Sequence, residues 1–280
     1  MSVFIPTTLE EALQLRADHP DADLLTGGTD MMVEVNFNHR KPSSVIALRR
    51  LSELKTWSID ASKGTITIGA GVPYAEMEHG TLAQTLPALA EAARTVGSPQ
   101  IRAAGTLGGN LGTCSPAGDG LPVLAAMNAT ITVASLQGER NIPFHDFMTG
   151  PKRNALQPGE IITAVTMPLS KGWQGYAKVG VRNAMVISVA SACVVFDNSN
   201  VRVALGSVGP TIIRCLDTER WWQSLSPSER AKPSDALARE FGQRASQEAR
   251  PIDDHRSTAS YRRHAISILT TRLLQRGTQS

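Results

Sequence analysis

Two segments of the chain, 80 positions apart, place a glycine pair among side chains that form hydrogen bonds. The first is Thr26-Gly-Gly-Thr-Asp30, and the second is the longer stretch Thr106-Leu-Gly-Gly-Asn-Leu-Gly-Thr-Cys-Ser-Pro-Ala-Gly-Asp119. Glycine lets a backbone N–H group approach a ligand without an intervening Cβ, and successive amides in such a turn form a concavity suited to phosphate. Each segment alone is better explained as a tight turn, but two in one domain can hold both phosphates of a dinucleotide from opposite sides.

Neither segment matches the common nucleotide-binding motifs. The sequence has no Gly-x-x-x-x-Gly-Lys-Ser/Thr, and no Gly-x-Gly-x-x-Gly between a first strand and its helix. Gly69-Ala-Gly71 is only a fragment of the second motif. A P-loop or a Rossmann dinucleotide site is therefore excluded.

The hydrophobic pattern predicts strands and helices that intermix as far as about residue 168, which is typical of an α+β protein. The capping-box spacing of Thr8 and Glu11 indicates a first helix. A last helix is expected from about Thr258 to Arg276, ended by Gly277, with an apolar face of Ala265, Ile268, Leu269 and Leu273. Strands are expected at 22–25, 45–48, 65–72, 130–134, 161–167, 176–196 and 201–207, with other helices from Pro73, at 86–96, at 121–126 and after Ser234.

The two parts of the chain differ in charge. Residues 1–170 carry 12 basic and 16 acidic side chains, whereas residues 171–280 carry 16 basic and 9 acidic ones. The basic residues are mostly arginine and are not interleaved with aromatic residues, so they favour a face that docks on a protein partner over a nucleic-acid surface. Pro168-Leu-Ser-Lys-Gly172, where this change begins, is the best candidate for a domain boundary.

Composition limits the location and the cysteine chemistry. The sequence has no run of about 18 apolar residues, which a transmembrane helix would need. The N-terminus also lacks the basic and apolar regions of a secretory signal, so we expect a cytoplasmic protein. The three cysteines are far apart and have neither metal-ligand spacing nor the pattern of a disulfide framework. Cys114 is expected to be a small neutral filler, with a partly exposed thiol as the alternative.

No catalytic residue and no metal ligand is predicted. The six histidines form no ligand pattern, and His145-Asp146 is interpreted as a hydrogen-bonded pair in a loop. Asp253-Asp254 is interpreted as solvated carboxylates at the start of a helix. Arg262-Arg263 is expected at the surface or at a subunit contact, and Trp221-Trp222 is expected to pack a helix against the core or a neighbour.

The two glycine segments together closely resemble the FAD-binding subunit of molybdenum hydroxylases, a family that includes xanthine dehydrogenase and carbon monoxide dehydrogenase. The resemblance covers essentially the whole chain, and the long second segment is its specific part. It extends to the N-terminal capped helix and to Gln100-Ile-Arg102, Phe147-Met-Thr-Gly-Pro151, Lys178…Arg182 and Asp254…Tyr261-Arg-Arg-His264.

This resemblance implies a fold and a set of FAD-binding residues. The fold is a vanillyl-alcohol-oxidase-type FAD-binding domain at 1–170, made of two α+β subdomains that divide near 55–60, followed by a C-terminal α+β domain, a sheet with helices, at 171–280. The residues implied to line the pyrophosphate and its neighbourhood are Gly27, Gly28, Thr29 and Asp30. Those implied to contact the pyrophosphate and the flavin side of FAD are Thr106, Gly108, Gly109 and Asn110.

Three further positions are implied nearer the ends of the cofactor. Asp119 matches an acidic position that binds toward the ribose of the adenosine half, and Ser115 lies in the same stretch. Lys178 matches a basic position near the pyrimidine edge of the isoalloxazine, where a cation stabilises the anionic reduced flavin.

The chain departs from the pattern of this family at one position that matters. Some relatives stack an aromatic ring on the flavin just before the second segment, whereas this chain has Val96 near that position, which leaves the choice between NAD and oxygen as acceptor open. Another branch inserts a cysteine-rich loop that holds an additional iron–sulfur cluster. The three scattered cysteines of this chain exclude that loop.

The family resemblance implies an electron-transfer role in a complex. A molybdopterin-binding large subunit oxidises the substrate, a [2Fe–2S] small subunit relays electrons, and the FAD of this chain passes them to NAD or another acceptor, in a dimer of heterotrimers. The stretch 178–188 is closer to the xanthine dehydrogenase branch, so we expect a purine or another N-heterocycle as substrate. The alternatives are a stand-alone flavin oxidoreductase of the same fold and a scaffold that has lost its flavin.

Overall fold

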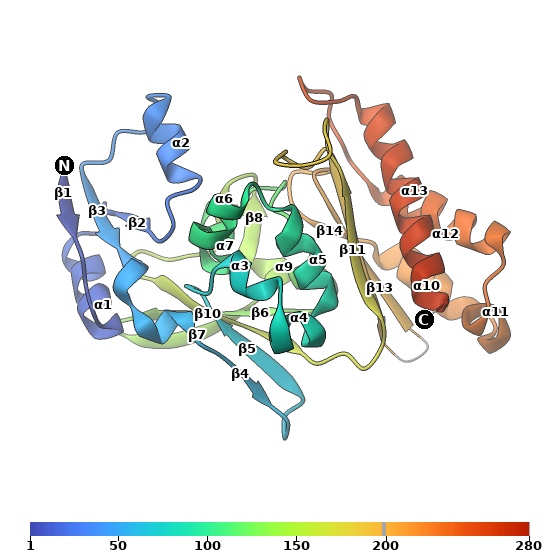
Figure 1. The fold of residues 1–280 in the computed structure, drawn as a ribbon, viewed down its shortest axis with the longest axis horizontal. Helices are drawn as coiled ribbons and strands as arrows, with labels where there is room; N and C mark the ends of the chain where they lie inside the picture. Colours follow the sequence, from blue (N-terminus) through green and yellow to red (C-terminus); the bar gives the residue numbers. More distant parts are fainter. Residues whose placement is uncertain (198–199, 280) are drawn as a thin grey trace. The chain divides into compact units, whose positions relative to one another are not determined.

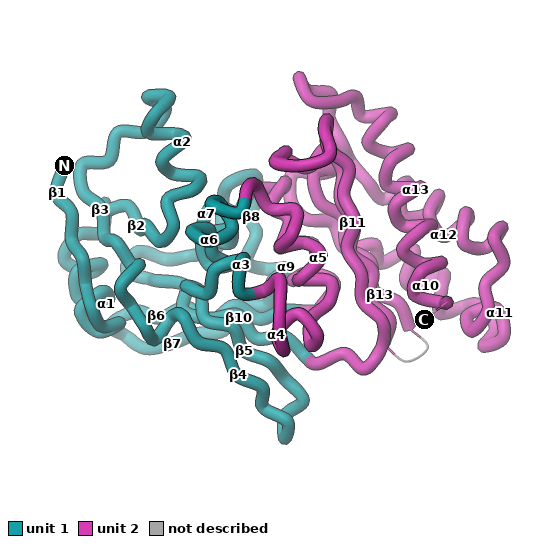
Figure 2. Tube along the Cα trace, viewed as in Figure 1, with its two compact units in different colours: residues 1–76, 99–114, 129–168 teal, residues 77–98, 115–128, 169–280 magenta. Residues whose placement is uncertain are grey.

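The computed structural model describes residues 1–197 and 200–279, which form two compact units (Figure 2). Unit 1 consists of residues 1–76, 99–114 and 129–168, and unit 2 consists of residues 77–98, 115–128 and 169–280. The division in space is therefore not a single cut in the sequence, because two early segments belong with the C-terminal part. The boundary of sequence domains near residue 170 stays a prediction.

Unit 1 begins with a small parallel sheet, which carries the first glycine turn. Its strands are β1 (Ser2–Phe4), β3 (Ser44–Ala47) and β2 (Asp23–Leu25), in that order across the sheet. Helix α1 (Leu9–Asp18) packs on it through the buried Ala12, and Thr8 caps this helix by accepting from the Glu11 N–H group at 3.2 Å. The predicted capped helix is thus confirmed. Helix α2 (Met31–Asn36) directly follows the glycine turn (Figure 1).

The larger sheet of unit 1 is antiparallel. Its five strands lie in the order β4 (Trp57–Asp60), β5 (Thr65–Gly69), β10 (Ile161–Pro168), β6 (Thr130–Ser135) and β7 (Gly138–Pro143). The predicted period-two alternation places Ile66 and Ile68 of β5 in the core. The strand ends at Gly69, three residues before the predicted end, because the chain there runs against the backbone of residue 54: a Cβ on Gly69 would lie 2.3 Å from the carbonyl oxygen of Leu54.

Short elements complete unit 1 around these sheets. They are the 3-10 turns η1 (Leu48–Arg50) and η2 (Ser52–Lys55), the helices α6 (Pro99–Ala104), α7 (Leu107–Thr113) and α9 (Phe144–Phe147), and the strands β8 (Met148–Gly150) and β9 (Arg153–Asn154). Helix α3 (Tyr74–Met77) begins after Pro73, as predicted, and lies where the chain passes from unit 1 to unit 2.

Unit 2 is a four-stranded antiparallel sheet with helices on both faces (Figure 1). The strands lie in the order β11 (Gln174–Val179), β12 (Ala190–Asp197), β13 (Asn200–Gly206) and β14 (Ile213–Arg214). Helices α10 (Leu216–Ser224), α12 (Asp235–Glu248) and α13 (Ala259–Thr278) cover one face through Trp222 and Phe241, and α5 (Pro87–Thr95) and α8 (Leu121–Ala126) pack on the other. The remaining helices are α4 (Gly80–Thr85) and α11 (Pro227–Ala231). Burial on both faces explains why β12 is apolar along nearly its whole length.

Three local predictions for unit 2 are wrong. The expected strand 176–196 is two strands, because residues 180–189 form a loop in which Met185 has a φ of +51°. Gly277 does not end α13, which continues to Thr278; a Cβ on Gly277 would lie 2.4 Å from the Phe196 ring, so close packing requires the glycine. On the buried face of α13, Ile266 takes the place predicted for Ile268, which is 38% exposed.

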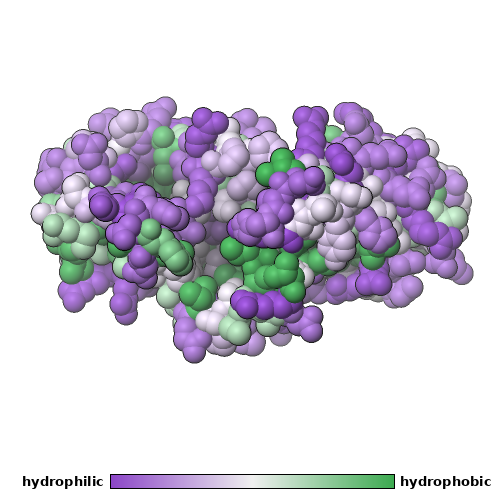
Figure 3. All heavy atoms as spheres, turned by 90° about the horizontal axis from the view of Figure 1, so that it is seen from above, coloured by the Kyte–Doolittle hydropathy of each residue, from purple (hydrophilic) through white to green (hydrophobic). Residues whose placement is uncertain are grey.

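No helix among the described residues is long and apolar enough to cross a membrane. On the face drawn in Figure 3, hydrophilic side chains predominate and hydrophobic ones gather in smaller areas between them.

Candidate functional site

The first glycine segment forms a turn whose backbone donors are available. Strand β2 ends at Leu25, and Gly28 takes a φ of +71°, a conformation that L-residues rarely adopt. Within the described part of the chain, the N–H groups of residues 27–31 donate no hydrogen bond, and the first amide of α2 that does so is that of Met32, to the Gly28 carbonyl at 3.0 Å. Successive amides that lack a protein acceptor are the donors that a phosphate group requires. This run of amides at 27–31 is hereafter the amide turn.

The two residues just before the second glycine segment, Ala104 and Gly105, lie directly against the amide turn. A Cβ on Gly27 would lie 1.8 Å from the carbonyl oxygen of Ala104, and a Cβ on Gly105 would lie 3.3 Å from the Thr29 hydroxyl oxygen. The approach at Gly27 is one of backbone on backbone, and a side chain at this position would prevent it. The structure therefore brings together the two segments that are 80 residues apart in the sequence.

The start of the second segment is helical and not only a tight turn. Thr106 is the N-cap of α7, and its hydroxyl oxygen accepts from the Gly109 N–H group at 3.0 Å. The Gly108 N–H group donates to the Ala70 carbonyl at 2.9 Å. Both glycine amides are thus engaged within the protein. Gly108 is required by packing, since its Cβ would lie 2.5 Å from that of Ala70.

Asn110 is a half-buried polar residue of α7. Its Oδ1 atom accepts a hydrogen bond of 2.7 Å from the hydroxyl of the buried Tyr74, so the amide Nδ2 is held as a donor. In residues 1–197 and 200–279, this Nδ2 atom has no acceptor. The other end of α7 is tied to the amide turn, because the Thr113 hydroxyl donates to Asp30 at 3.3 Å.

Unit 2 holds the other predicted site residues, among them a buried ion pair between Asp119 and Lys178. The Lys178 Nζ atom lies 2.7 Å from Asp119 Oδ2, and the two side chains are only 8% and 9% exposed. The hydroxyl of Tyr176 donates to Asp119 Oδ1 at 2.8 Å. Burial raises the pKa of the Asp119 carboxyl, against the opposing effect of the adjacent Lys178 ammonium.

This ion pair constrains the predicted roles of its two members. The resemblance assigns Asp119 to the ribose end of FAD and Lys178 to the pyrimidine edge of the flavin, yet the two side chains are in direct contact. Both assignments stay predictions. Val96, half-buried, follows Thr95, whose carbonyl accepts from Lys178 at 2.8 Å. Ser115 accepts from the Ala117 N–H group within its own turn at 3.3 Å.

The remaining sequence-based interpretations have mixed outcomes. Cys114 is a buried filler, as predicted, and burial raises the pKa of its thiol to about 12.

His145 and Asp146 form an exposed pair at 3.3 Å, but at the start of helix α9 rather than in a loop. Arg262 is not a surface residue: it is 3% exposed, donates to the Val189 carbonyl at 2.7 Å and pairs with Asp254 at 2.7 Å. No group of three His, Cys, Asp or Glu among the described residues could hold a metal ion.

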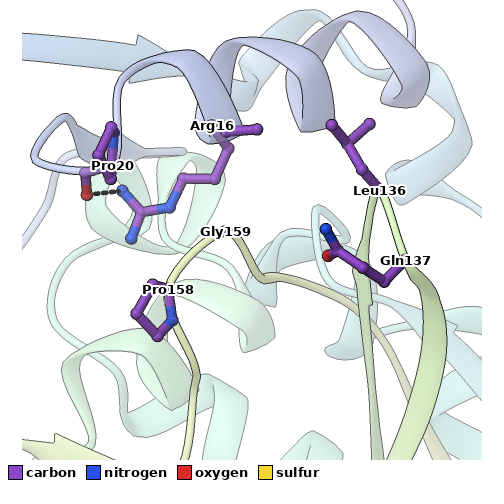
Figure 4. A pocket seen from close by; sticks show the side chains of 7 residues that line it. Arg16, Pro20, Leu136, Gln137, Pro158 and Gly159 are labelled. Carbon is purple, nitrogen blue, oxygen red and sulfur yellow. Dashed lines mark hydrogen bonds between the residues drawn. The ribbon is translucent and has the colours of Figure 1, made fainter.

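A surface pocket in unit 1 is separate from these residues. It lies where the end of α1 meets two turns, and Figure 4 shows that the Arg16 guanidinium is directed to the Pro20 carbonyl, to which it donates at 2.9 Å. None of the predicted cofactor-binding residues lines it; the lining residues are Arg16, Ala17, Pro20, Leu136, Gln137, Pro158 and Gly159.

Two tyrosines of the site were missed by the sequence-based reasoning. Tyr176 precedes Lys178 by two positions on β11, and strand periodicity places both on one face of the sheet, so this signal was available in the sequence. Tyr74 has no such signal. Its partner Asn110 is 36 residues away, and only the fold brings the two side chains together.

Comparisons with known proteins identify the family. A family model described as the FAD binding domain in molybdopterin dehydrogenase matches residues 1–170, and one described as the CO dehydrogenase flavoprotein C-terminal domain matches residues 176–276. The nicotinate dehydrogenase FAD-subunit of Eubacterium barkeri is 39% identical to this chain over 194 residues. The match spans 66% of this chain and 65% of the Eubacterium barkeri subunit, which is just under two thirds of that subunit's length. The xanthine dehydrogenase FAD-binding subunit of Escherichia coli O157:H7 is 29% identical over 95% of this chain and 92% of its own.

The fold agrees with the sequence matches. The crystal structure of quinoline 2-oxidoreductase from Pseudomonas putida 86 superposes with a TM-score of 0.92 at 24% identity, over 100% of this chain and 97% of the other. The expected α+β FAD-binding fold with a C-terminal domain is confirmed. The chain belongs to the family of FAD-binding subunits of molybdopterin dehydrogenases.

Proposed function

We propose that this chain binds the pyrophosphate of FAD on the amide turn and uses the flavin to pass electrons out of a molybdenum hydroxylase complex. The observation that carries this proposal is the run of amides from Gly27 to Met31 without a protein acceptor, next to the Asn110 Nδ2 donor. FAD supplies the chemistry of accepting electrons singly and releasing them in pairs. The protein supplies the donors that hold the cofactor and the charges near it.

The predicted site residues of unit 1 fall into two groups, those that donate hydrogen bonds to FAD and those that hold the donors in place. We assign the backbone N–H groups of residues 27–30, the Thr29 hydroxyl and Asn110 Nδ2 to the pyrophosphate and the adjoining flavin side of FAD. We assign a supporting role to Thr106, Gly108 and Gly109, because the Thr106 hydroxyl and the two glycine N–H groups are used to build the start of α7 and to seat it against Ala70.

In unit 2 we assign Lys178 to the pyrimidine edge of the flavin, where a cation favours the anionic reduced form. Asp119 then acts through Lys178 as its buried counter-ion, rather than on the ribose. Val96 remains the proposed neighbour of the flavin face, and Ser115 a part of the same cofactor-binding stretch.

The assembly belongs to the proposal. We place the substrate reaction on a molybdopterin-binding large subunit and the electron relay on a [2Fe–2S] small subunit, in a cytoplasmic dimer of heterotrimers that reduces NAD or another acceptor. Residues 171–280 carry 16 basic but only 9 acidic side chains, and this net positive charge supports a docking face for a partner chain.

The proposed substrate is an N-heterocycle. The relatives reported above are named for nicotinate, xanthine and quinoline, which all contain a nitrogen in an aromatic ring. The identity of the large subunit that co-purifies with the chain tests this assignment. A large subunit that oxidises carbon monoxide and no N-heterocycle would contradict it.

Substitution of Asn110 tests the cofactor site. Asn110→Leu removes the Nδ2 donor, and we expect FAD to bind at least about tenfold more weakly, as for the loss of a hydrogen bond to a charged group. The control is Asn141→Leu on β7, whose side-chain Oδ1 accepts a hydrogen bond of 2.9 Å from the Thr132 hydroxyl. FAD titration of each purified chain, followed by flavin fluorescence, measures the effect. A wild-type chain that takes up no FAD would defeat the proposed function itself.

A further inference from the structure

The loop between β11 and β12, residues 180–187, is exposed and closed upon itself. Its apolar side chains Val181, Met185 and Ile187 are 67%, 55% and 52% exposed. Arg182 donates to the carbonyls of residues 184 and 185 inside the loop. Gly180 lies so close to Val186 that a Cβ on it would be 2.3 Å from the Val186 side chain. The loop is therefore a small self-contained structure with few ties to the sheet beneath it.

One hydrogen bond fastens this loop to unit 2. The Lys178 ammonium donates to the Val186 carbonyl at 3.1 Å, and no other hydrogen bond between described residues joins 180–187 to the remainder of unit 2. The same ammonium donates to the Thr95 carbonyl at 2.8 Å and to Asp119 at 2.7 Å. A lysine ammonium has three N–H donors, so all of its donors are in use.

The three bonds differ in how easily they can open. Asp119 is buried, and breaking its ion pair would leave a carboxylate without its cation, which is strongly destabilising. The bond to Thr95 joins Lys178 to the C-terminal end of α5, which packs on β11. The bond to Val186 is the longest of the three and ends on an exposed loop. It is the one that Lys178 can release to take another acceptor.

We propose that Lys178 is a positioning residue for the 180–187 loop, and that the Val186 carbonyl and FAD compete for its third donor. Without FAD, Asp119 and Thr95 fix the ammonium, and the ammonium holds Val186. When a flavin carbonyl takes the third donor, the loop loses its one hydrogen bond to the described part of unit 2. The second half of this inference rests on the proposed function, because it uses the assignment of Lys178 to the flavin.

Trypsin cleavage after Arg182 reports whether the loop is fastened, because the protease needs an extended, accessible chain. The test variant is Lys178→Met with Asp119→Asn, which removes both charges together and so leaves no buried charge unpaired. In the FAD-free full chain, we expect cleavage after Arg182 in this variant to be about tenfold faster than in the wild type, measured by mass spectrometry of the fragments.

Arg140→Met with Glu160→Gln is the matched control, because it removes both charges of an ion pair of unit 1 without touching the loop. Its cleavage after Arg182 should equal that of the wild type. Equal rates in the wild type and the Lys178→Met, Asp119→Asn variant would overturn the positioning role. Hydrogen exchange of the peptide 180–188 in the same three proteins is a second readout, and only the Lys178→Met, Asp119→Asn variant should exchange faster.

The FAD-loaded chains test the competition. Saturation with FAD should increase cleavage of the wild type and leave that of the Lys178→Met, Asp119→Asn variant unchanged. If FAD binds stoichiometrically but wild-type cleavage stays constant or slows, the competition is wrong and FAD binding stands. If no FAD binds, the proposed function fails, while the comparison of the FAD-free proteins still decides the positioning role.

Discussion

At the scale of single residues, the glycines of this chain act in two different ways. Gly28 supplies a φ of +71° in the amide turn, whereas Gly27 and Gly108 permit close packing of backbone on backbone. The sequence showed that glycine was needed in these segments, and the expected reason was access of a ligand to the backbone. The packing reason could not be predicted, because Ala104 and Ala70 become neighbours only in the fold.

Gly27→Ala should therefore destabilise the protein even without FAD. The new Cβ would lie 1.8 Å from the Ala104 carbonyl oxygen, and overpacking of this kind costs at least about 1–3 kcal/mol. Gly112→Ala is the control in the same helix region, because outside its own helix turn no atom of the described residues lies within 4 Å of its Cβ position, and alanine favours the helix by about 0.5–1 kcal/mol. Urea unfolding of both FAD-free variants measures the difference, and equal stabilities would refute the packing role.

Tyr74 is a second residue whose role comes from the fold. Tyr74→Phe removes the hydroxyl that orients Asn110, and we expect FAD affinity to fall roughly two- to tenfold, the effect of about 0.5–1.5 kcal/mol. Tyr261→Phe, at a side chain that is 50% exposed on α13, should leave the affinity unchanged. Flavin fluorescence titration compares the two. An unchanged affinity in Tyr74→Phe would show that Asn110 does not depend on this bond.

At the scale of elements, hydrophobic periodicity predicted the type and the position of a helix or strand well where a single pattern continued without interruption. The helix 121–126 and the cap at Ser234 are found as predicted, since local sequence alone determines both. The loop 180–189 was missed because apolar residues run through it, and composition cannot distinguish such a loop from a buried strand. The start of α7 was missed because glycine is a poor helix former and tertiary packing overrides that preference.

A pH effect is expected at the edge of the large sheet. Arg140 of β7 lies 2.5 Å from Glu160, whose side chain is 7% exposed, and this hydrogen bond lowers the pKa of Glu160 below its usual value of 4.5. The stabilisation, about 1.5–3 kcal/mol for a charged hydrogen bond, is present above pH 4.5 and is lost as the pH falls through the lowered pKa.

Glu160→Gln should remove this part of the pH dependence, so wild type and variant converge in stability in acid and differ at neutral pH. Glu139→Gln, at the exposed neighbouring carboxylate on β7, should retain the wild-type profile. Urea unfolding between pH 3 and 7 makes the comparison. A constant difference between wild type and Glu160→Gln over this range would contradict the assignment.

At the scale of the whole molecule, the family and the α+β class were predictable because the resemblance spans the chain. The division of the chain into two units in space could not be predicted from the sequence. Residues 77–98 and 115–128 join the C-terminal unit, and this depends on α5 and α8 packing on the sheet of residues 174–214. Such long-range packing leaves no local pattern, apart from the apolar composition of both helices.

FAD should stabilise the whole chain against unfolding. A ligand that binds only the folded state contributes about 2.7 kcal/mol at a concentration of 100 times its Kd. The midpoint of thermal unfolding should therefore rise with FAD concentration in the wild type and rise less in Asn110→Leu. A midpoint that is independent of FAD in the wild type would contradict binding to the folded chain.

The central claim is that the amide turn, and not the glycine amides of α7, donates to the cofactor. The most direct measurement is the 15N–1H spectrum of the full chain labelled at glycine, recorded with and without FAD. We predict that the Gly27 and Gly28 amide protons shift downfield on binding, whereas those of Gly108 and Gly109, already bonded within the protein, change little. FAD that binds while Gly27 and Gly28 remain unshifted would contradict the account.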